Sequence, residues 1–411
     1  MTEKIYYKFI QFALGTYDGK EFLDGSALNG FDWQRFYAFA KKQTLAGIII
    51  EGIARLPKAV APKQGLLMNW FMMSQNISRQ NMMLNAATAE IYNKVKAAGY
   101  DCCILKGQAN APMYAHTATR TPGDVDIWVD ASREEIRQLA QTLAKENGRI
   151  DEESYNHIAL TTNGISVELH YTPGFMANFT YNRRLQQWFR ESIAAQCRNM
   201  IALPDEAGEV AAPTAAFNAV YQLYHLYHHY FYEGVGLRQV VDYYYVILNF
   251  ELGVLNCSLR DEELKNCELE SQNSKLNNSK SAKPTIQNSK LKTQHSLTRL
   301  GLWHFAGAMM YVLHEVLGLP EEKMIAPMDK KRGEMLLNDI LCGGNFGHHD
   351  ERHAWGRDTY DGNGFKHGAL GHNLLRLHRD LRLLKYYPSE ALSEPIFRLW
   401  HYYWLWKIHQ L

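Results

Sequence analysis

The clearest structural signal in this chain is GDVDIWVD, residues 123–130, where valine and isoleucine alternate with aspartate and tryptophan. A period of two residues is typical of a strand with one buried face. A short apolar run, DCCILKG at 101–107, precedes this segment, and the helical pattern SREEIRQLAQTLAKENG at 132–148 follows it. HIALTTNGISVELHY at 157–171 then adds two alternating strands around Asn163-Gly164, a pair typical of two-residue hairpin turns. Together these segments predict a small module of strands and helices.

The Asn-Gly turn also predicts the register of the hairpin. The predicted pairs are Thr162 with Ile165, Leu160 with Val167, Ile158 with Leu169, Ala159 with Glu168, and His157 with His170. In this register the large aliphatic side chains share one face, while Glu168, His157 and His170 share the other. We therefore expect a carboxylate and two imidazoles on the polar side of the sheet, within reach of a bound phosphate.

Asp124 and Asp126 lie two residues apart, so a strand directs both carboxylates to the same face. Convergent carboxylates suit magnesium, which binds to one or two of them together with water and substrate phosphates. By itself the pair is weak evidence, because about 4 or 5 such acidic pairs are expected by chance in 411 residues with 43 Asp and Glu. Glu168 on the polar face of the hairpin strengthens the prediction as a candidate third carboxylate.

Lys106, Gly107 and Gln108 place a glycine at the end of the first predicted strand, where the backbone can approach a phosphate. Lys106 either neutralises that phosphate or is a solvated lysine at the end of a strand. The same two interpretations hold for Arg120, four residues before Asp124. Both are candidates for nucleotide binding.

The order LKGQ (105–108), RTPGDVDIWV (120–129) and SVELH (166–170) resembles the DNA polymerase beta-type nucleotidyltransferase superfamily. Within it, the chain is most similar to the poorly characterised bacterial group of stand-alone nucleotidyltransferases. The helical half of that group resembles HLYHHYFYEGVGLRQVVDYYYVIL (225–248) and GGNFGHH (343–349). The specific motifs span the module of strands and helices, and a looser likeness extends over most of the rest.

The resemblance implies an enzyme that moves a nucleoside monophosphate from a triphosphate to an acceptor and releases pyrophosphate. It implies two magnesium ions held by the catalytic carboxylates of Asp124, Asp126 and Glu168. The nucleotide-binding set that we expect is Lys106, Gly107, Gln108, Arg120, His157, His170 and Arg238. The superfamily loop commonly has serine or glycine after its glycine, whereas Gln108 follows Gly107 here. The acceptor, the base of the nucleotide and the oligomeric state stay open.

Helical periodicity continues on both sides of the module. We expect an α+β fold with a mixed-sheet nucleotidyltransferase core at 99–180, an N-terminal helical segment at 1–98 and a C-terminal helical domain at 181–411. Residues 256–298 are poor in aromatics and rich in Ser, Asn and Lys, which predicts a disordered insertion between two helices. The aromatic end, IFRLWHYYWLWKIHQL at 396–411, is either a core helix, which is favoured, or a helix on a membrane surface.

The C-terminal half also contains a competing set of candidate metal ligands. His225 and His229 share a helix face, and HHDERH at 348–353 follows a glycine-rich loop, as would suit a His/Asp metal-dependent phosphohydrolase. Polar tips on aromatic core helices explain these histidines more simply, and a catalytically inactive nucleotide-binding module is a third alternative. For Arg238, a salt bridge to Asp242 within one helix is favoured over phosphate binding.

Composition and charge exclude several classes of protein. The chain is 46% hydrophobic and 21% charged, unlike disordered or fibrous proteins. With 44 Lys and Arg against 43 Asp and Glu the formal net charge is +1, so a dedicated nucleic-acid binder is not expected. The six cysteines show no C-x-x-C spacing, and histidines and a glutamate interrupt the most apolar stretch, 302–319. We expect a cytoplasmic protein with reduced thiols, no signal peptide and no transmembrane segment.

Overall fold

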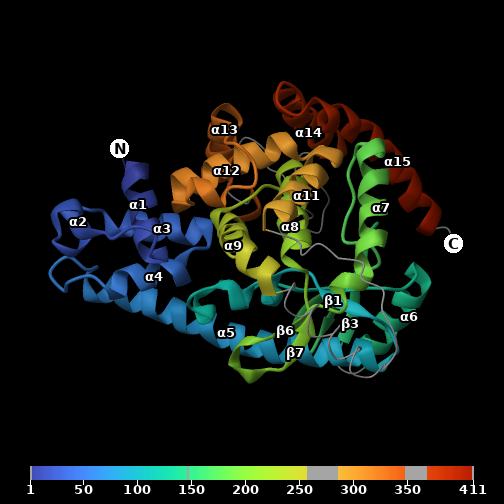
Figure 1. The fold of residues 1–411 in the computed structure, drawn as a ribbon, viewed down its shortest axis with the longest axis horizontal. Coiled ribbons are helices and arrows are strands. Elements are labelled where there is room, and N and C mark those ends of the chain that lie inside the picture. The colour runs from blue at the N-terminus through green and yellow to red at the C-terminus, as the bar shows by residue number, and fades with distance from the viewer. Residues whose placement is uncertain (1, 146–147, 257–285, 348–367, 410–411) are drawn as a thin grey trace, which may run out of the picture.

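A computed structural model describes residues 2–145, 148–256, 286–347 and 368–409. The N-terminal helices lie at one end of the molecule, and the long helix α5 (Gln64–Ala97) runs from them along the edge of the molecule to the sheet (Figure 1). Most of the predicted insertion, 257–285, and the HHDERH segment lie outside the described residues.

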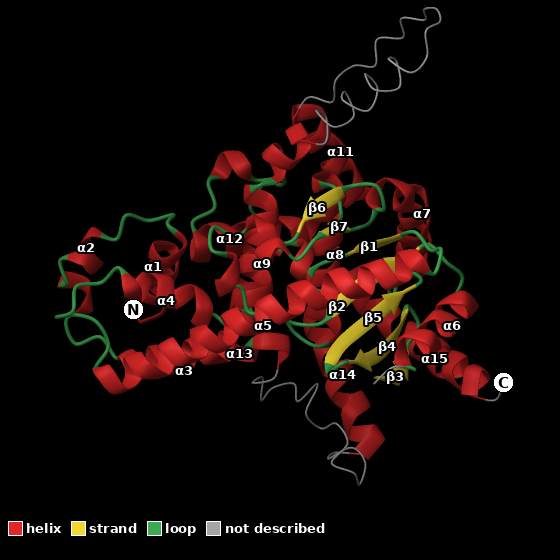
Figure 2. Ribbon diagram, turned by 90° about the horizontal axis from the view of Figure 1, so that it is seen from below, coloured by secondary structure: helices red, strands yellow, loops and turns green. Residues whose placement is uncertain are grey.

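The predicted module forms a five-stranded mixed sheet with the strand order β1-β2-β5-β4-β3 (Figure 2). The strands are β1 (Cys102–Ile104), β2 (Val125–Val129), β3 (Gly148–Glu153), β4 (His157–Thr162) and β5 (Ile165–His170). β2 and β5 are parallel, and the other neighbours are antiparallel. The predicted hairpin register is confirmed at every pair. Asn163 and Gly164 form the turn that fixes it, with the positive φ angles of 50° and 77° that a tight hairpin turn requires. The fold class is α+β, as predicted.

The two faces of the sheet have different partners. Val167 and Leu169 point from β5 into an apolar core with α5 and α6 (Arg133–Ala144). On the opposite face Trp128 of β2 packs against aromatic rings of α7 (Phe179–Gln196) and α8 (Ala215–Tyr232). The polar face of the hairpin therefore lies toward the helical half of the molecule.

The remaining helices come before the sheet or after α8 in the chain. Those before the sheet are α1 (Thr2–Leu14), α2 (Lys20–Leu23), α3 (Trp33–Gln43) and α4 (Ala46–Ala54). Those after α8 are α9 (Leu237–Leu248), α11 (Ile286–Arg299), α12 (Trp303–Leu317), α13 (Lys330–Gly343), α14 (Gly368–Leu384) and α15 (Pro388–His409). In the described part of the chain, no helix combines the length and the apolarity that crossing a membrane requires.

Two sequence predictions about the helical half need correction. The predicted disordered insertion is helical from residue 286, because Ser289, Thr293 and Leu297 recur every four residues and bury one face of α11. The small side chains of Ser289 and Thr293 let α11 pack against α8, although the segment is poor in aromatics. The half predicted to be helical also contains a two-stranded sheet, β6 (Met200–Ala202) and β7 (Glu209–Ala211). Strands of three residues are too short for their alternation to show in the sequence.

Candidate active site

Three carboxylates converge on the polar face of the sheet. Asp126 of β2 pairs directly with Glu168 of the parallel strand β5, and Asp124 lies just before β2. One carboxylate oxygen from each of the three residues lies within 4.8 Å of the others. Asp126 is buried, whereas Asp124 and Glu168 are half-buried and line a cavity. The structure therefore brings together the three carboxylates that the sequence singled out.

Two cationic side chains contact these carboxylates. Nζ of Lys106 lies 3.2 Å from Oδ1 of Asp126, and Nε2 of His170 lies 3.1 Å from that same oxygen. Lys106 takes this position because the chain turns sharply out of β1 at Gly107, where φ is +62°. A Cβ at Gly107 would also lie 3.3 Å from the carbonyl oxygen of Asp124, so glycine permits both the turn and the close approach.

His170 is the charged imidazole of the hairpin. Burial disfavours its charged form, but hydrogen bonds to Asp126 and Glu168 outweigh burial and raise its pKa to about 9. Burial alone would raise the pKa of Glu168, yet the hydrogen bond and the charge of His170 lower it to about 2. For His157, burial and the charge of His170 lower the pKa to about 4. At neutral pH the hairpin therefore presents one imidazolium, one neutral imidazole and one carboxylate.

The opposite wall of the site is the face of α8. Nε2 of His225 lies 3.1 Å from Nζ of Lys106 and 2.9 Å from Nε2 of His229. Nδ1 of His229 lies 2.8 Å from Oε2 of Glu233, whose side chain is 53% exposed. Burial and the charge of Lys106 hold the pKa of His225 well below its usual value. A hydrogen-bonded row of side chains thus leads from the carboxylates to solvent.

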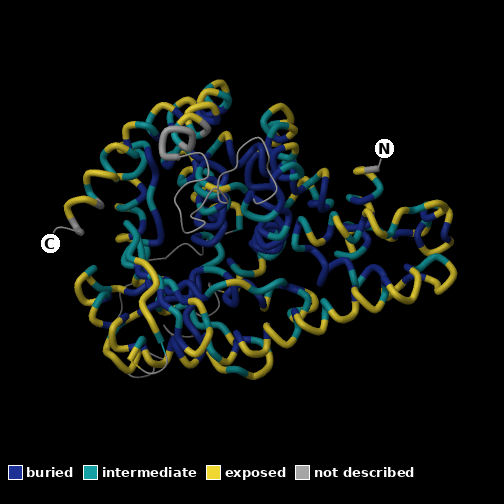
Figure 3. The backbone as a smooth tube through the Cα atoms, turned by 180° about the vertical axis from the view of Figure 1, so that it is seen from behind, coloured by how far each residue is buried: buried dark blue, intermediate teal, exposed yellow. Residues whose placement is uncertain are grey.

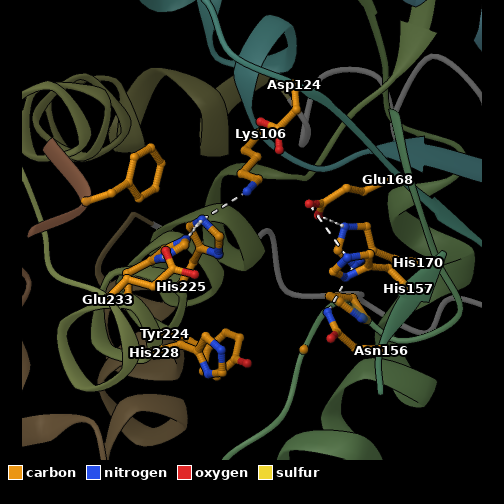
Figure 4. A pocket seen from close by; sticks show the side chains of 14 residues that line it. Lys106, Asp124, Asn156, His157, Glu168, His170, Tyr224, His225, His228 and Glu233 are labelled. Atoms are coloured by element: carbon orange, nitrogen blue, oxygen red, sulfur yellow. Dashed lines mark hydrogen bonds and ion pairs between the residues drawn. The ribbon is translucent and has the colours of Figure 1, made fainter. Parts of the chain in front are cut away.

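A cavity of about 470 Å³ separates the two walls. Figure 4 shows Glu168, His157 and His170 on one side and His225 and Glu233 on the other. The remaining lining residues are Lys106, Asp124, Asn156, Pro173, Gly174, Tyr224, His228, His229 and Phe346. The volume lies within the range of roughly 300–1,000 Å³ that is typical of small-molecule sites.

The carboxylate set fits a hard divalent cation. Oδ2 of Asp126 is buried and has no hydrogen-bond partner among the described residues, so one of its oxygens is available to a ligand. Oxygen ligands of this kind suit magnesium. His157, Glu168 and His170 form a second close group of metal-binding atoms, but Nε2 of His170 is already engaged by two carboxylates. The geometry therefore favours the all-carboxylate group over a site with imidazole ligands.

Three of the predicted nucleotide-binding side chains, Gln108, Arg120 and Arg238, do not line this cavity. The amide nitrogen of Gln108, which is 1% exposed, donates to Asn85, and its oxygen lies 3.3 Å from Nη1 of Arg120. Arg120 is itself 1% exposed and forms a bidentate pair with Asp242 at 2.8 and 2.9 Å. Tyr114 donates to the same carboxylate at 2.6 Å. Gln108 and Arg120 thus fasten the loop before β2 to α9, instead of pointing into the 470 Å³ cavity.

Arg238 differs from the favoured sequence interpretation. Its expected partner, Asp242, is bound to Arg120, and Arg238 lies over the loop that carries Asp124. A Cβ on Gly123 would be 3.0 Å from Nη2 of Arg238. Arg238 also borders a small pocket of about 40 Å³ together with Lys106 and Asp124, and the pair of Arg120 and Asp242 borders the same pocket. Its guanidinium is therefore close to the carboxylate site, on the side of the glycine turn.

Sequence reasoning missed part of the α8 wall. It noted that His225 and His229 share a helix face, but favoured polar tips on a core helix over a competing metal site and did not connect them with the carboxylates. Glu233 was not singled out, although its spacing of four residues from His229 is the signal for a contact along a helix. Asn156, which comes from a loop, lines the cavity without any sequence signal, whereas Phe346 lies in the glycine-rich GGNFGHH segment that carried part of the family resemblance but was given no place in the site.

A mixed sheet with Asp-x-Asp on one strand and a third carboxylate on its parallel neighbour, all beside a cavity, defines a protein of the nucleotidyltransferase class. The chain belongs to the family described as uncharacterised nucleotidyltransferases, whose model matches residues 29–274. This match includes the whole five-stranded sheet together with α8 and α9, and thus both walls of the cavity. The predicted superfamily is confirmed, and with it the general chemistry of nucleotidyl transfer. No curated protein and no solved structure matches the chain.

Proposed function

We propose that this protein is a magnesium-dependent nucleotidyltransferase that transfers a nucleoside monophosphate from a nucleoside triphosphate to an acceptor hydroxyl or phosphate. Pyrophosphate is the second product. The observation that carries the proposal is the convergence of Asp124, Asp126 and Glu168 within 4.8 Å, around a buried carboxylate oxygen without a partner. Membership of the family supports transfer at the general level. We place the reaction in the cytoplasm, and a nucleic-acid acceptor is not proposed because the net charge is only +1.

Asp124, Asp126 and Glu168 would hold two magnesium ions, which when bound supply charge neutralisation for the triphosphate and for the attacking and leaving oxygens. Lys106 is the chain's own cation at this position. Burial would lower its pKa, but the three carboxylates raise it, so Lys106 stays charged. Its ammonium can exchange its contact with Asp126 for a phosphate oxygen. Arg238, on the far side of the glycine turn, supplies a second cation for the same phosphates.

The acceptor has room on the α8 side of the cavity. His157 and His225 are neutral, so they offer hydrogen-bond partners to a hydroxyl without attracting an anion there. Glu168 lies 3.7 Å from Nε2 of His157 and within 4.8 Å of the other two carboxylates, where it can ligate the catalytic metal and face the acceptor. The row from His225 through His229 to Glu233 forms the wall of the cavity on this acceptor side.

The phosphohydrolase alternative receives less support from the same wall. A His/Asp hydrolase needs imidazoles that converge with a carboxylate on one metal ion. Here His225 and His229 are hydrogen-bonded to each other, and His225 faces the ammonium of Lys106. Elemental analysis of the purified protein separates the classes, since firmly bound zinc, iron or manganese would favour hydrolysis.

Calorimetric titration with each nucleoside triphosphate, with and without magnesium, tests the proposal. Binding of one or more triphosphates that requires magnesium is the expected result. Incubation with α-labelled triphosphates and cell extract would then identify the labelled acceptor. Equal binding of triphosphate with and without magnesium would rule out the proposed magnesium site. Magnesium-dependent binding without any labelled product would instead indicate the inactive nucleotide-binding module.

A further inference from the structure

The C-terminal helix α15 carries an apolar stripe on its outer face that no other part of the described chain covers. The stripe consists of Leu392, Ile396, Leu399, Tyr403 and Trp406, which are 61%, 59%, 73%, 59% and 57% exposed. Their spacing alternates between four and three residues, so they form one continuous line along the helix. Figure 3 shows exposed stretches recurring along the outer side of the C-terminal helices. The prediction that this segment is a core helix therefore applies only to the inner face of α15.

The neighbouring helix α14 repeats this pattern. Leu374, Leu377 and Leu381 are 58%, 44% and 60% exposed and recur at steps of three and four residues. α14 and α15 pack against each other in the molecule (Figure 1). A large exposed apolar area of this kind marks an interaction surface in a folded protein.

The charges of the two helices are divided between an inner and an outer side. All three carboxylates of α14 and α15, Asp380, Glu390 and Glu394, are buried, with exposures of 3%, 2% and 1%. Arg379 and Arg398 pair with Asp380 and Glu394 inside the molecule. Two lysines of this part of the chain are exposed: Lys407, which follows Trp406 directly, and Lys385, in the connection between the two helices. The exposed side of these helices thus includes two lysines close in sequence to the apolar residues, whereas all three carboxylates of the helices are buried.

We propose that the α15 stripe and the exposed leucines of α14 bind to an anionic lipid membrane, with α15 lying along its surface. Amphipathic helices with Leu and Trp on one face and lysines at its border bind in this way. Trp and Tyr are enriched where protein meets the lipid headgroups, and lysines there gain from anionic lipids. Because the inner face of α15 packs on the protein through Phe397 and its buried carboxylates, α15 can meet lipid only with its outer side, which carries the stripe.

A second copy of the chain is the competing occupant of this surface. In a twofold dimer the same surface meets itself, so each lysine would face a patch that carries no exposed carboxylate of α14 or α15. Like charges across an interface disfavour such a pairing. Anionic headgroups neutralise Lys385 and Lys407 and also cover the apolar stripe, which favours the membrane.

Co-sedimentation of the full-length protein with lipid vesicles tests this proposal. The vesicles are phosphatidylcholine alone and phosphatidylcholine mixed with phosphatidylglycerol. We expect binding to the anionic vesicles and a loss of about tenfold or more on Leu399→Glu or Trp406→Glu, which place a charge in the apolar layer. Lys407→Gln should weaken binding about fivefold, as should added salt.

Met83→Glu is the matched control, because Met83 is 60% exposed on α5, away from the stripe. It should bind to vesicles as the wild type does, and thermal melting of every variant should match the wild type because all these side chains are exposed. No binding of the wild type to anionic vesicles would overturn the proposal, as would an equal loss in Met83→Glu. A dimer in analytical ultracentrifugation that Leu399→Glu dissociates, without vesicle binding, would assign the stripe to a second copy.

Discussion

His170 and Asp126 are joined by a contact of 3.1 Å between Nε2 and Oδ1, which ties β5 to β2 across the polar face of the sheet. The same nitrogen lies 3.1 Å from Oε2 of Glu168. The imidazolium therefore stands between two carboxylates that would otherwise repel each other. It compensates charge at the position where a divalent cation would bind, and the two cations compete for the same oxygens.

His170→Gln should therefore lower the stability of the metal-free protein and increase its stabilisation by magnesium. The variant leaves Asp126 and Glu168 without their shared cation, while it removes the competitor of the metal. Thermal melting with and without magnesium measures both effects. His157→Gln is the control, since a neutral His157 with a pKa of about 4 contributes little charge. An equal magnesium effect in wild type and His170→Gln would contradict the competition.

The same contact predicts a dependence of stability on pH. The folded-state pKa of His170, about 9, lies above the ordinary value of 6.5. Its stabilisation is therefore complete below pH about 6.5 and is lost as the pH rises through about 9, with an upper limit of about 3 kcal/mol. Urea unfolding of wild type and His170→Gln across this range measures it. A difference in unfolding free energy that stays constant with pH would count against a charged His170.

Asp126→Asn should abolish magnesium-dependent triphosphate binding, because it keeps the shape of the side chain but removes a metal-binding charge. Glu168→Gln should lower transfer by about 10²-fold or more, with a smaller effect on nucleotide binding. Calorimetry and pyrophosphate release measure these two effects. Asp130→Asn is the matched control, since Asp130 follows β2 but is exposed. Unchanged binding and transfer in both site variants would show that the carboxylates are structural.

Arg120→Lys should lower the free energy of unfolding by about 3 kcal/mol, because lysine cannot form the buried bidentate pair with Asp242. The affinity of the folded variant for magnesium and triphosphate should change much less. Chemical unfolding and calorimetry on the same sample separate the two roles. Arg149→Lys, in an exposed pair with Asp151, is the control. A loss of affinity at unchanged stability would restore Arg120 as a direct phosphate ligand.

Glu390→Gln should make the protein more stable at mildly alkaline pH and change little below pH about 5. Burial raises the pKa of Glu390 to about 7, from the ordinary 4.5, even though the backbone N–H groups of Ala177 and Asn178 donate to it. Its favourable contribution is complete below pH about 4.5 and is lost as the pH rises through about 7. Melting temperatures of wild type and variant against pH check this. Burial also raises the pKa of Asp380 to about 7, so both proteins keep the part of the pH dependence of stability that comes from Asp380.

The positions of residues that depend only on local backbone geometry could be predicted from the sequence. The Asn163-Gly164 turn and the two-residue alternation were sufficient for the hairpin register, because side chains on a strand can only alternate between two faces. The same rule placed Asp124 and Asp126 on one side and Glu168 beside them. The helix α6 also followed from local signals, since its capping box at Ser132 and Glu135 is present.

Only the tertiary structure decided which side chains that lie far apart in the sequence become partners. Asp242 accepts from Arg120, 122 residues away, and not from Arg238 on its own helix, because burial of the guanidinium demands a bidentate partner. Likewise Gln108 turned inward to Asn85, and α8 placed His225 opposite the carboxylates. The burial of α11 against α8 made a segment of low apolar content helical. A local period specifies the face on which a side chain lies, but only packing of the whole chain specifies what that face meets.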